Sequence, residues 1–173
     1  MFSKHEGNGY ICDTIKLPAY DTSEEIELEK IATEATESIV NIPAFFATAD
    51  LPKAGTIQCR WIHYPAPIKE KDDKEGYFPE CLLAVNKGNG YILKPELTKT
   101  RSAKEIQAVL INLCKEFDNL HHCPLQISVP DLATESLLKA FCKALKIKLV
   151  KERRPLRELN EAWEFLHNNT MDM

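Results

Sequence analysis

Two cysteines and two histidines gather within ten residues in the C-terminal half of the chain: Cys114, His121, His122 and Cys123. Cysteine and histidine are common zinc ligands, and a structural zinc site needs four ligands in tetrahedral geometry. The usual spacing, with two ligands two to four residues apart on each side of the site, is absent. Cys114 also falls on the apolar stripe of a predicted helix, which indicates burial. The sequence therefore predicts neither a metal site nor a cofactor.

A cysteine nucleophile would need a base beside its thiolate. Cys59 and His63 share one face of a predicted strand, but four residues of strand span about 13 Å, which excludes direct contact. A cross-strand pair of His63 with Cys81 is the alternative. The chain also lacks a G-x-S-x-G motif, a Walker loop and a G-x-G-x-x-G motif. These observations favour a protein that is not an enzyme.

The most distinctive charged feature is a basic segment near the C terminus. Residues 143–157 contain seven Lys or Arg and one acid, Glu152, whereas residues 1–50 contain three Lys and ten Asp or Glu. The basic segment falls at a strand-to-helix junction, where backbone N–H groups can add to the Arg charge. It predicts a binding surface for an anion or an acidic partner, and the alternative is a solvated surface. The predicted binding residues are Lys151, Arg153, Arg154 and Arg157.

The whole chain has the composition of an ordinary globular protein, with 44% hydrophobic and 28% charged residues among 173. Its formal net charge of −4 excludes a whole-molecule field that attracts nucleic acid. Its opening residues lack the apolar run of a signal peptide, and apolar stretches are too short to span a membrane. We therefore predict a cytoplasmic protein that does not bind membranes, with its six cysteines as free thiols.

Hydrophobic periodicity predicts the elements that position these residues. In the N-terminal third, Tyr10–Leu17 is predicted as a strand, and a helix follows from a capping box at Thr22 and Glu25. Pro43 and Pro52 then bracket a stretch that is predicted to be irregular. From Thr56 onward, the predicted strands are Thr56–Tyr64, Cys81–Val85, Tyr91–Leu93, Leu125–Val129 and Ile147–Val150.

Three helices are predicted among the later strands. The first begins at a second capping box, Ser102 and Glu105, and the next is capped by Asp131. The last carries an apolar stripe from Leu156 to Leu166. The predicted order is β-β-β-α-β-α-β-α, which indicates an antiparallel meander followed by parallel crossover strands. We predict a mixed α/β sheet flanked by helices, with an N-terminal appendage (residues 1–54), a main domain (55–168) and a disordered tail (169–173).

This order resembles the ribonuclease H-like fold, whose nucleases hold two metal ions with a cluster of carboxylates. The resemblance implies an acid near the middle of the first strand of the meander, but Thr56–Tyr64 contains none. Glu105 and Asp131 are explained as helix caps, and Glu161 falls in the last helix. An active enzyme would therefore have to use Asp131, Glu105 and Glu161.

The segment Cys123–Asn168 also resembles the C-terminal part of a bacterial domain family of unknown function. The matching text is P-L-Q-I-S-V-P-D from Pro124, A-L-K-I-K-L from Ala144 and L-N-E-A-W-E-F-L from Leu159. This resemblance implies a fold and no activity.

Two functions follow as expectations. The first is a non-enzymatic interaction or regulatory module that binds another macromolecule, most directly another protein, with nucleic acid as a further partner of the basic segment 143–157. The alternative is a nucleic-acid-processing enzyme, or its inactive relative, with a ribonuclease H-like core.

Overall fold

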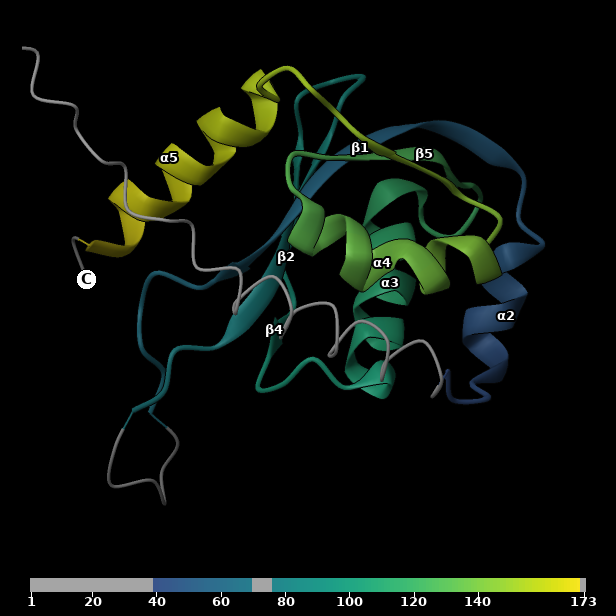
Figure 1. The fold of residues 1–173 in the computed structure, drawn as a ribbon, viewed down its shortest axis with the longest axis horizontal. Coiled ribbons are helices and arrows are strands. Elements are labelled where there is room, and N and C mark those ends of the chain that lie inside the picture. The colour runs from purple at the N-terminus through teal and green to yellow at the C-terminus, as the bar shows by residue number, and fades with distance from the viewer. Residues whose placement is uncertain (1–38, 70–75, 172–173) are drawn as a thin grey trace, which may run out of the picture.

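The computed structural model describes residues 39–69 and 76–171. The predicted strand Tyr10–Leu17 and the helix that begins after Thr22 lie outside the described residues. With labels as in Figure 1, the helices are α2 (Pro43–Ala49), α3 (Ala103–Asp118), α4 (Leu132–Ala144) and α5 (Arg157–Met171). The strands are β1 (Lys53–His63), β2 (Glu80–Asn86), β3 (Ile92–Leu93), β4 (Leu97–Thr98), β5 (Cys123–Val129) and β6 (Lys148–Lys151).

The described strands form one six-stranded mixed sheet in the order β3-β2-β1-β5-β6, with β4 also paired to β2. The β1–β2 and β2–β3 pairs are antiparallel, whereas β1–β5 and β5–β6 are parallel. A meander on one side of β1 is thus joined to crossover strands on the other side. The predicted mixed α/β fold with ribonuclease H-like order is confirmed.

The helices divide between the two faces of the sheet, with α2, α3 and α4 on one side and α5 on the other (Figure 1). The side chains of Ile57, Cys59 and Trp61 alternate along β1 into the larger core, which packs against α3 and α4. On the opposite face, α5 packs over β1 and β2 through a smaller apolar cluster: Leu83, Val85, Leu156, Leu159 and Ala162.

The predicted local signals at two helix starts are confirmed. Ser102 Oγ accepts a hydrogen bond from the Glu105 backbone N–H at 3.3 Å, which caps α3. Asp131 Oδ1 accepts one from the Thr134 backbone N–H at 2.8 Å, which caps α4. The side-chain oxygen of each cap pairs an N–H group that the helix leaves without a partner.

The prediction that the stretch between Pro43 and Pro52 is irregular is wrong. Pro43 occupies the first turn of α2, where a missing N–H removes no helical hydrogen bond. Phe45 of this short helix is fully buried and packs edge-to-face on Phe141 of α4, with ring centroids 6.4 Å apart. The division of the chain at residue 54 stays a prediction. At the other end, α5 continues to Met171, into the segment predicted as a tail.

None of the helices in the described ranges is long and apolar enough to cross a membrane. The five described cysteines are free and buried in the structure: Cys59, Cys81, Cys114, Cys123 and Cys142.

Candidate functional site

A buried polar pair lies at the centre of the sheet, where β1 and β5 run parallel. Gln58 of β1 and Ser128 of β5 are register partners, with only 2% and 1% of their surfaces exposed. Their neighbours Ile57 and Ile127 point into the larger core. Because side chains alternate along a strand, Gln58 and Ser128 lie on the opposite face, the one that carries α5. Burial of polar side chains in a sheet requires hydrogen-bond partners.

Two glutamates supply those partners from the last crossover. Gln58 Nε2 donates to Glu158 Oε2 of α5 at 2.9 Å, and Ser128 Oγ donates to Glu152 Oε1 at 3.1 Å. Glu152 directly follows β6, and its backbone N–H is anchored by Val129 O at 2.9 Å. We call Gln58, Ser128, Glu152 and Glu158 the polar row. It joins β1, β5 and the β6–α5 connection.

One atom of the polar row has no partner. Gln58 Oε1 is buried and makes no hydrogen bond among the described residues. Leaving a buried acceptor unpaired costs about 1–3 kcal/mol. Glu158 is ionised beside it: its own backbone N–H, and then the Gln58 amide, lower the pKa of its carboxyl group. The row therefore presents acceptors.

Arg60 and Asp131 form an ion pair at 3.0 Å on the same side of the sheet. Asp131 is thus occupied twice, by Arg60 and by the backbone of α4 that it caps. Both interactions fit a structural role at the β5–α4 turn.

The alternative catalytic residues are held by three separate structural interactions. Asp131 caps α4, Glu105 binds Ser102 and Thr100 at the start of α3, and Glu161 binds Arg157 in α5. Within residues 39–69 and 76–171, no three His, Cys, Asp or Glu side chains are grouped so that they could hold a metal ion. β1 contains no acid, as predicted from its sequence.

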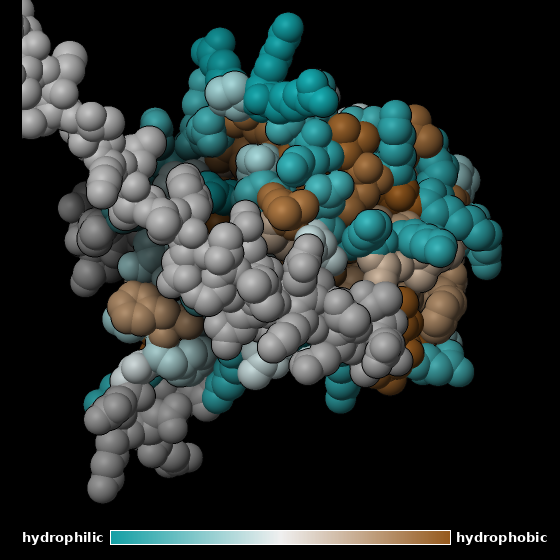
Figure 2. All heavy atoms as spheres, in the orientation of Figure 1, coloured by the Kyte–Doolittle hydropathy of each residue, from teal (hydrophilic) through white to brown (hydrophobic). Residues whose placement is uncertain are grey.

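Three of the four predicted binding residues form an unpaired cationic group. Lys151, Arg153 and Arg154 are exposed, and no acidic side chain of the described residues pairs with them. We call these three residues the cationic loop. The fourth predicted residue, Arg157, is 86% exposed but binds Glu161 at 2.7 Å. Hydrophilic side chains cover the top of the molecule in Figure 2, where Figure 1 shows the chain passing from β6 into α5.

The cysteine and histidine candidates are only partly brought together. Cys114 Sγ lies 3.8 Å from Cys123 Sγ inside the core, whereas His122 binds Asp118 on the surface at 2.5 Å. His63 faces Glu80 across the β1–β2 pair and Cys81 faces Ile62, so the alternative cross-strand pair of His63 with Cys81 is wrong.

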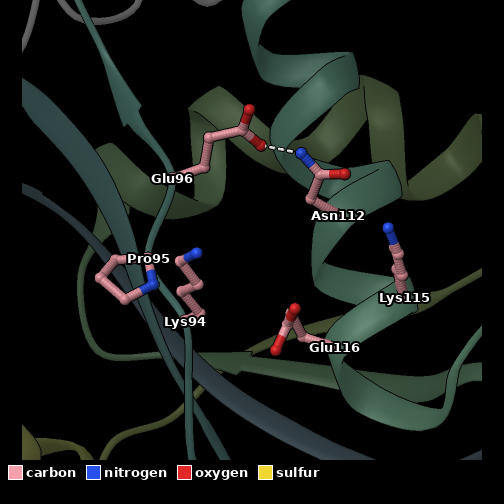
Figure 3. A pocket seen from close by; sticks show the side chains of 6 residues that line it. All are labelled: Lys94, Pro95, Glu96, Asn112, Lys115 and Glu116. Carbon is pink, nitrogen blue, oxygen red and sulfur yellow. Dashed lines mark hydrogen bonds between the residues drawn. The ribbon is translucent and has the colours of Figure 1, made fainter.

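A shallow hollow of about 270 Å³ lies between the β3–β4 connection and α3 (Figure 3). Its lining is mixed in charge: Lys94 and Lys115 oppose Glu96 and Glu116, and Asn112 donates to Glu96. Neither sign of charge dominates the lining, so the hollow gives no indication of a ligand class.

The sequence analysis missed the polar row. Gln58 and Ser128 are ordinary residues in otherwise apolar strands, and Glu158 and Glu152 look like solvated acids. One feature of the sequence pointed to the row: Gln58 is a polar residue in the middle of a predicted strand, between the apolar residues Ile57 and Cys59. This feature identifies a site only when the strand pairing is known, because the pairing places Gln58 beside Ser128.

Structural comparison finds six matching chains, among them three retroviral proteins of low similarity. The catalytic core domain of BIV integrase has 13% identity and a TM-score of 0.44, covering 68% of this chain and 66% of that one. The HTLV-2 integrase catalytic core domain has 18% identity and a TM-score of 0.41, covering 65% and 84%. A chain of the simian T-cell lymphotropic virus intasome has 18% identity and a TM-score of 0.41, covering 70% and 42%.

Comparison with curated proteins gives no match. A family model does match, over residues 48–167, and it includes the polar row and the cationic loop. The resemblance to a family of unknown function is thereby confirmed, and it covers the whole sheet rather than the C-terminal segment alone. The chain belongs to the family described as Domain of unknown function (DUF6930).

Proposed function

We propose that this chain is a non-enzymatic module that binds the sugar–phosphate backbone of a nucleic acid through the cationic loop. The observation that carries the proposal is that Lys151, Arg153 and Arg154 are exposed and have no acidic partner among the described residues. The acid nearest to them in the sequence belongs to the polar row. Glu152 lies between these cations in the sequence, yet its carboxylate binds Ser128. Arginine side chains left free in this way suit phosphate, which they bind in a bidentate manner.

The place of the loop in the topology supports a ligand site. From β1 the chain moves to β2 on one side, and it returns through α3 to β5 on the other side. Open α/β sheets bind ligands at such a reversal, beyond the carboxyl ends of the parallel strands. The cationic loop follows the end of β6, and the polar row spans the β1–β5 boundary.

The polar row adds hydrogen-bond acceptors to the cations. The carboxylates of Glu152 and Glu158, which are half-buried, can accept hydrogen bonds from sugar hydroxyls or base amino groups. A ligand that carries both phosphates and such donors matches the site better than a simple anion does. This match, and a strand order shared with nucleases, favour nucleic acid over the protein partner that is the first expectation from the sequence.

The test is fluorescence anisotropy with labelled single-stranded RNA, single-stranded DNA, duplex DNA and poly-glutamate as probes. Reversing both arginines, Arg153→Glu with Arg154→Glu, should weaken nucleic-acid binding by about tenfold or more, because binding depends on phosphate neutralisation. The matched control is Lys94→Glu with Lys115→Glu, two exposed cations at the hollow beside α3. Each double variant changes the formal net charge from −4 to −8.

Equal loss in both double variants would show that net charge, not the cationic loop, controls binding. Binding of poly-glutamate but of no nucleic acid would support an acidic protein partner instead. Binding of no probe would contradict the proposal.

The alternative function, a nuclease that uses Asp131, Glu105 and Glu161, has its own test. We expect no cleavage of labelled RNA, DNA or RNA–DNA hybrid with Mg²⁺ or Mn²⁺, because these three acids are engaged by separate parts of the fold. If the wild type cleaved one of these substrates and Asp131→Asn abolished the cleavage, the nuclease function would be supported instead.

A further inference from the structure

The thiols of Cys114 and Cys123 are in contact inside the core. Cys114 lies on the core face of α3, Cys123 begins β5, and both are fully buried. Their Sγ atoms are 3.8 Å apart. A disulfide bond would require them to approach by about 1.8 Å, to the usual bond length of about 2.0 Å.

The surroundings of the pair activate one sulfur over the other. The hydrogen bond from the Cys114 thiol lowers the pKa of Cys123 to about 7 against the effect of burial, and the Lys53 ammonium acts in the same direction. Lys53 is the register partner of Cys123 across the β1–β5 pair. The hydrogen bond to Cys123, and then burial, raise the pKa of Cys114. These effects favour the thiolate at Cys123 and the thiol at Cys114, the arrangement found in reactive cysteine pairs.

The chain segment that joins the two cysteines has an unusual backbone conformation. α3 ends at Asp118, and the next residues, Asn119 and Leu120, have left-handed backbone with φ of 47° and 62°. Such a conformation is disfavoured for leucine. Both residues are exposed, and a peroxide would have to enter by local opening of this connection, because the two sulfurs are fully buried.

We propose that Cys114 and Cys123 form a reversible modification site, in which a peroxide oxidises the pair to an intramolecular disulfide. The Cys123 thiolate attacks hydrogen peroxide and takes up one oxygen, and with one proton the other oxygen leaves as water. The Cys114 thiol then attacks the Cys123 sulfenic acid, the S–S bond forms, and hydroxide leaves with the Cys114 proton as a second water. Two thiols lose two electrons, and the peroxide gains them.

This inference does not depend on the proposed function. The pair lies at the beginning of β5, and the cationic loop is near the opposite end of the parallel strands. Oxidation is therefore expected to leave the cationic loop in place.

Peptide mapping of the native full-length chain tests the proposal. Trypsin places each of the six cysteines in a separate peptide, with Cys114 in Glu105–Lys115 and Cys123 in Glu116–Lys139. After treatment with hydrogen peroxide and blocking of free thiols, we expect one linked pair of these two peptides, two hydrogen atoms lighter than their sum. Thioredoxin or dithiothreitol should restore both peptides.

Cys142→Ala is the matched control, because Cys142 is a buried core cysteine whose pKa burial raises to about 12. It should still give the link, whereas Cys123→Ala should give none. The proposal is overturned if wild-type Cys114 and Cys123 both remain alkylatable after oxidation, or if Cys123 links to a different cysteine. The peptide map of the oxidised wild-type chain decides between these outcomes, so the test remains valid even if a variant fails to fold.

Discussion

The two faces of the sheet are closed by different chemistry. On the α3–α4 face, the larger core is continuous and apolar, from Ile57 in β1 to Ile127 in β5. On the α5 face, apolar packing covers β1 and β2, but at the β1–β5 boundary it gives way to Gln58, Ser128 and their glutamates. Buried polar groups stabilise a fold less than apolar packing does. On the basis of this difference we propose that the first face maintains the fold and that the second carries the binding site.

Substitutions of Ile57 and Gln58 test this comparison, because these adjacent residues of β1 face opposite sides of the sheet. Ile57→Ala removes a fully buried side chain from the larger core and should lower the free energy of unfolding by about 2–5 kcal/mol. Urea denaturation followed by circular dichroism measures the loss. A loss below about 1 kcal/mol would contradict the assignment of this face as the stabilising one.

Two substitutions of Asp131 test whether this acid, at the β5–α4 turn, has a structural role. Asp131→Ala removes the cap of α4 and the ion pair with Arg60, and should lower the free energy of unfolding by about 1 kcal/mol. Asp131→Asn keeps a capping oxygen and loses only the ion pair, and Arg60 is half-exposed, so it should cost less than about 0.5 kcal/mol. Equal losses in the same denaturation experiment would show that the charge, not the cap, is what matters.

Gln58 gives the smallest expected change among the buried side chains considered. Gln58→Met has similar volume and removes the hydrogen bond to Glu158 together with the unpaired Oε1 atom. These effects oppose each other, so the free energy of unfolding should change by less than about 1 kcal/mol. Nucleic-acid binding should weaken at the same time. A large loss of stability with unchanged binding would make Gln58 a structural residue.

The smallest expected effect is the change in the free energy of unfolding with pH that is due to Glu105 at the start of α3. Burial raises the pKa of Glu105, but hydrogen bonds from Thr100, Ser102 and backbone N–H groups outweigh it, and the pKa is lowered from its ordinary value of 4.5. A carboxyl whose folded pKa is lowered stabilises the protein above the unfolded value and loses that effect as pH falls through the folded one. Wild type should therefore exceed Glu105→Gln in stability at neutral pH, and the difference should shrink below about pH 4.5. A constant difference across that range would contradict the role of the charge.

Much of the fold could be predicted from local patterns. The capping residues Ser102 and Asp131, the stripe of α3 and the apolar run of β2 each depend on neighbours in the sequence, so periodicity and cap chemistry located them. The short strand β4 was missed because two residues carry no period. Pro43 was read as a break because the first helical turn and a loop both accept proline.

The candidate site could be predicted only in part. The cations of the loop are contiguous in sequence and were found, but the pairing of Arg157 with Glu161 was not anticipated. The polar row joins residues 100 positions apart, Gln58 and Glu158, so no local pattern contains it. It became visible only when the β1–β5 register placed Gln58 beside Ser128.

The central claim is that the cationic loop binds nucleic-acid phosphates, and the salt dependence of affinity tests it most directly. Three cations that neutralise three phosphates of a single strand predict a slope of about −2 in a plot of log K against log salt. The Arg153→Glu, Arg154→Glu variant, which keeps Lys151 alone, should show a slope of about −0.7 or shallower. The Lys94→Glu, Lys115→Glu control should keep the wild-type slope. A wild-type slope near zero, or one that the loop reversal leaves unchanged, would contradict the account.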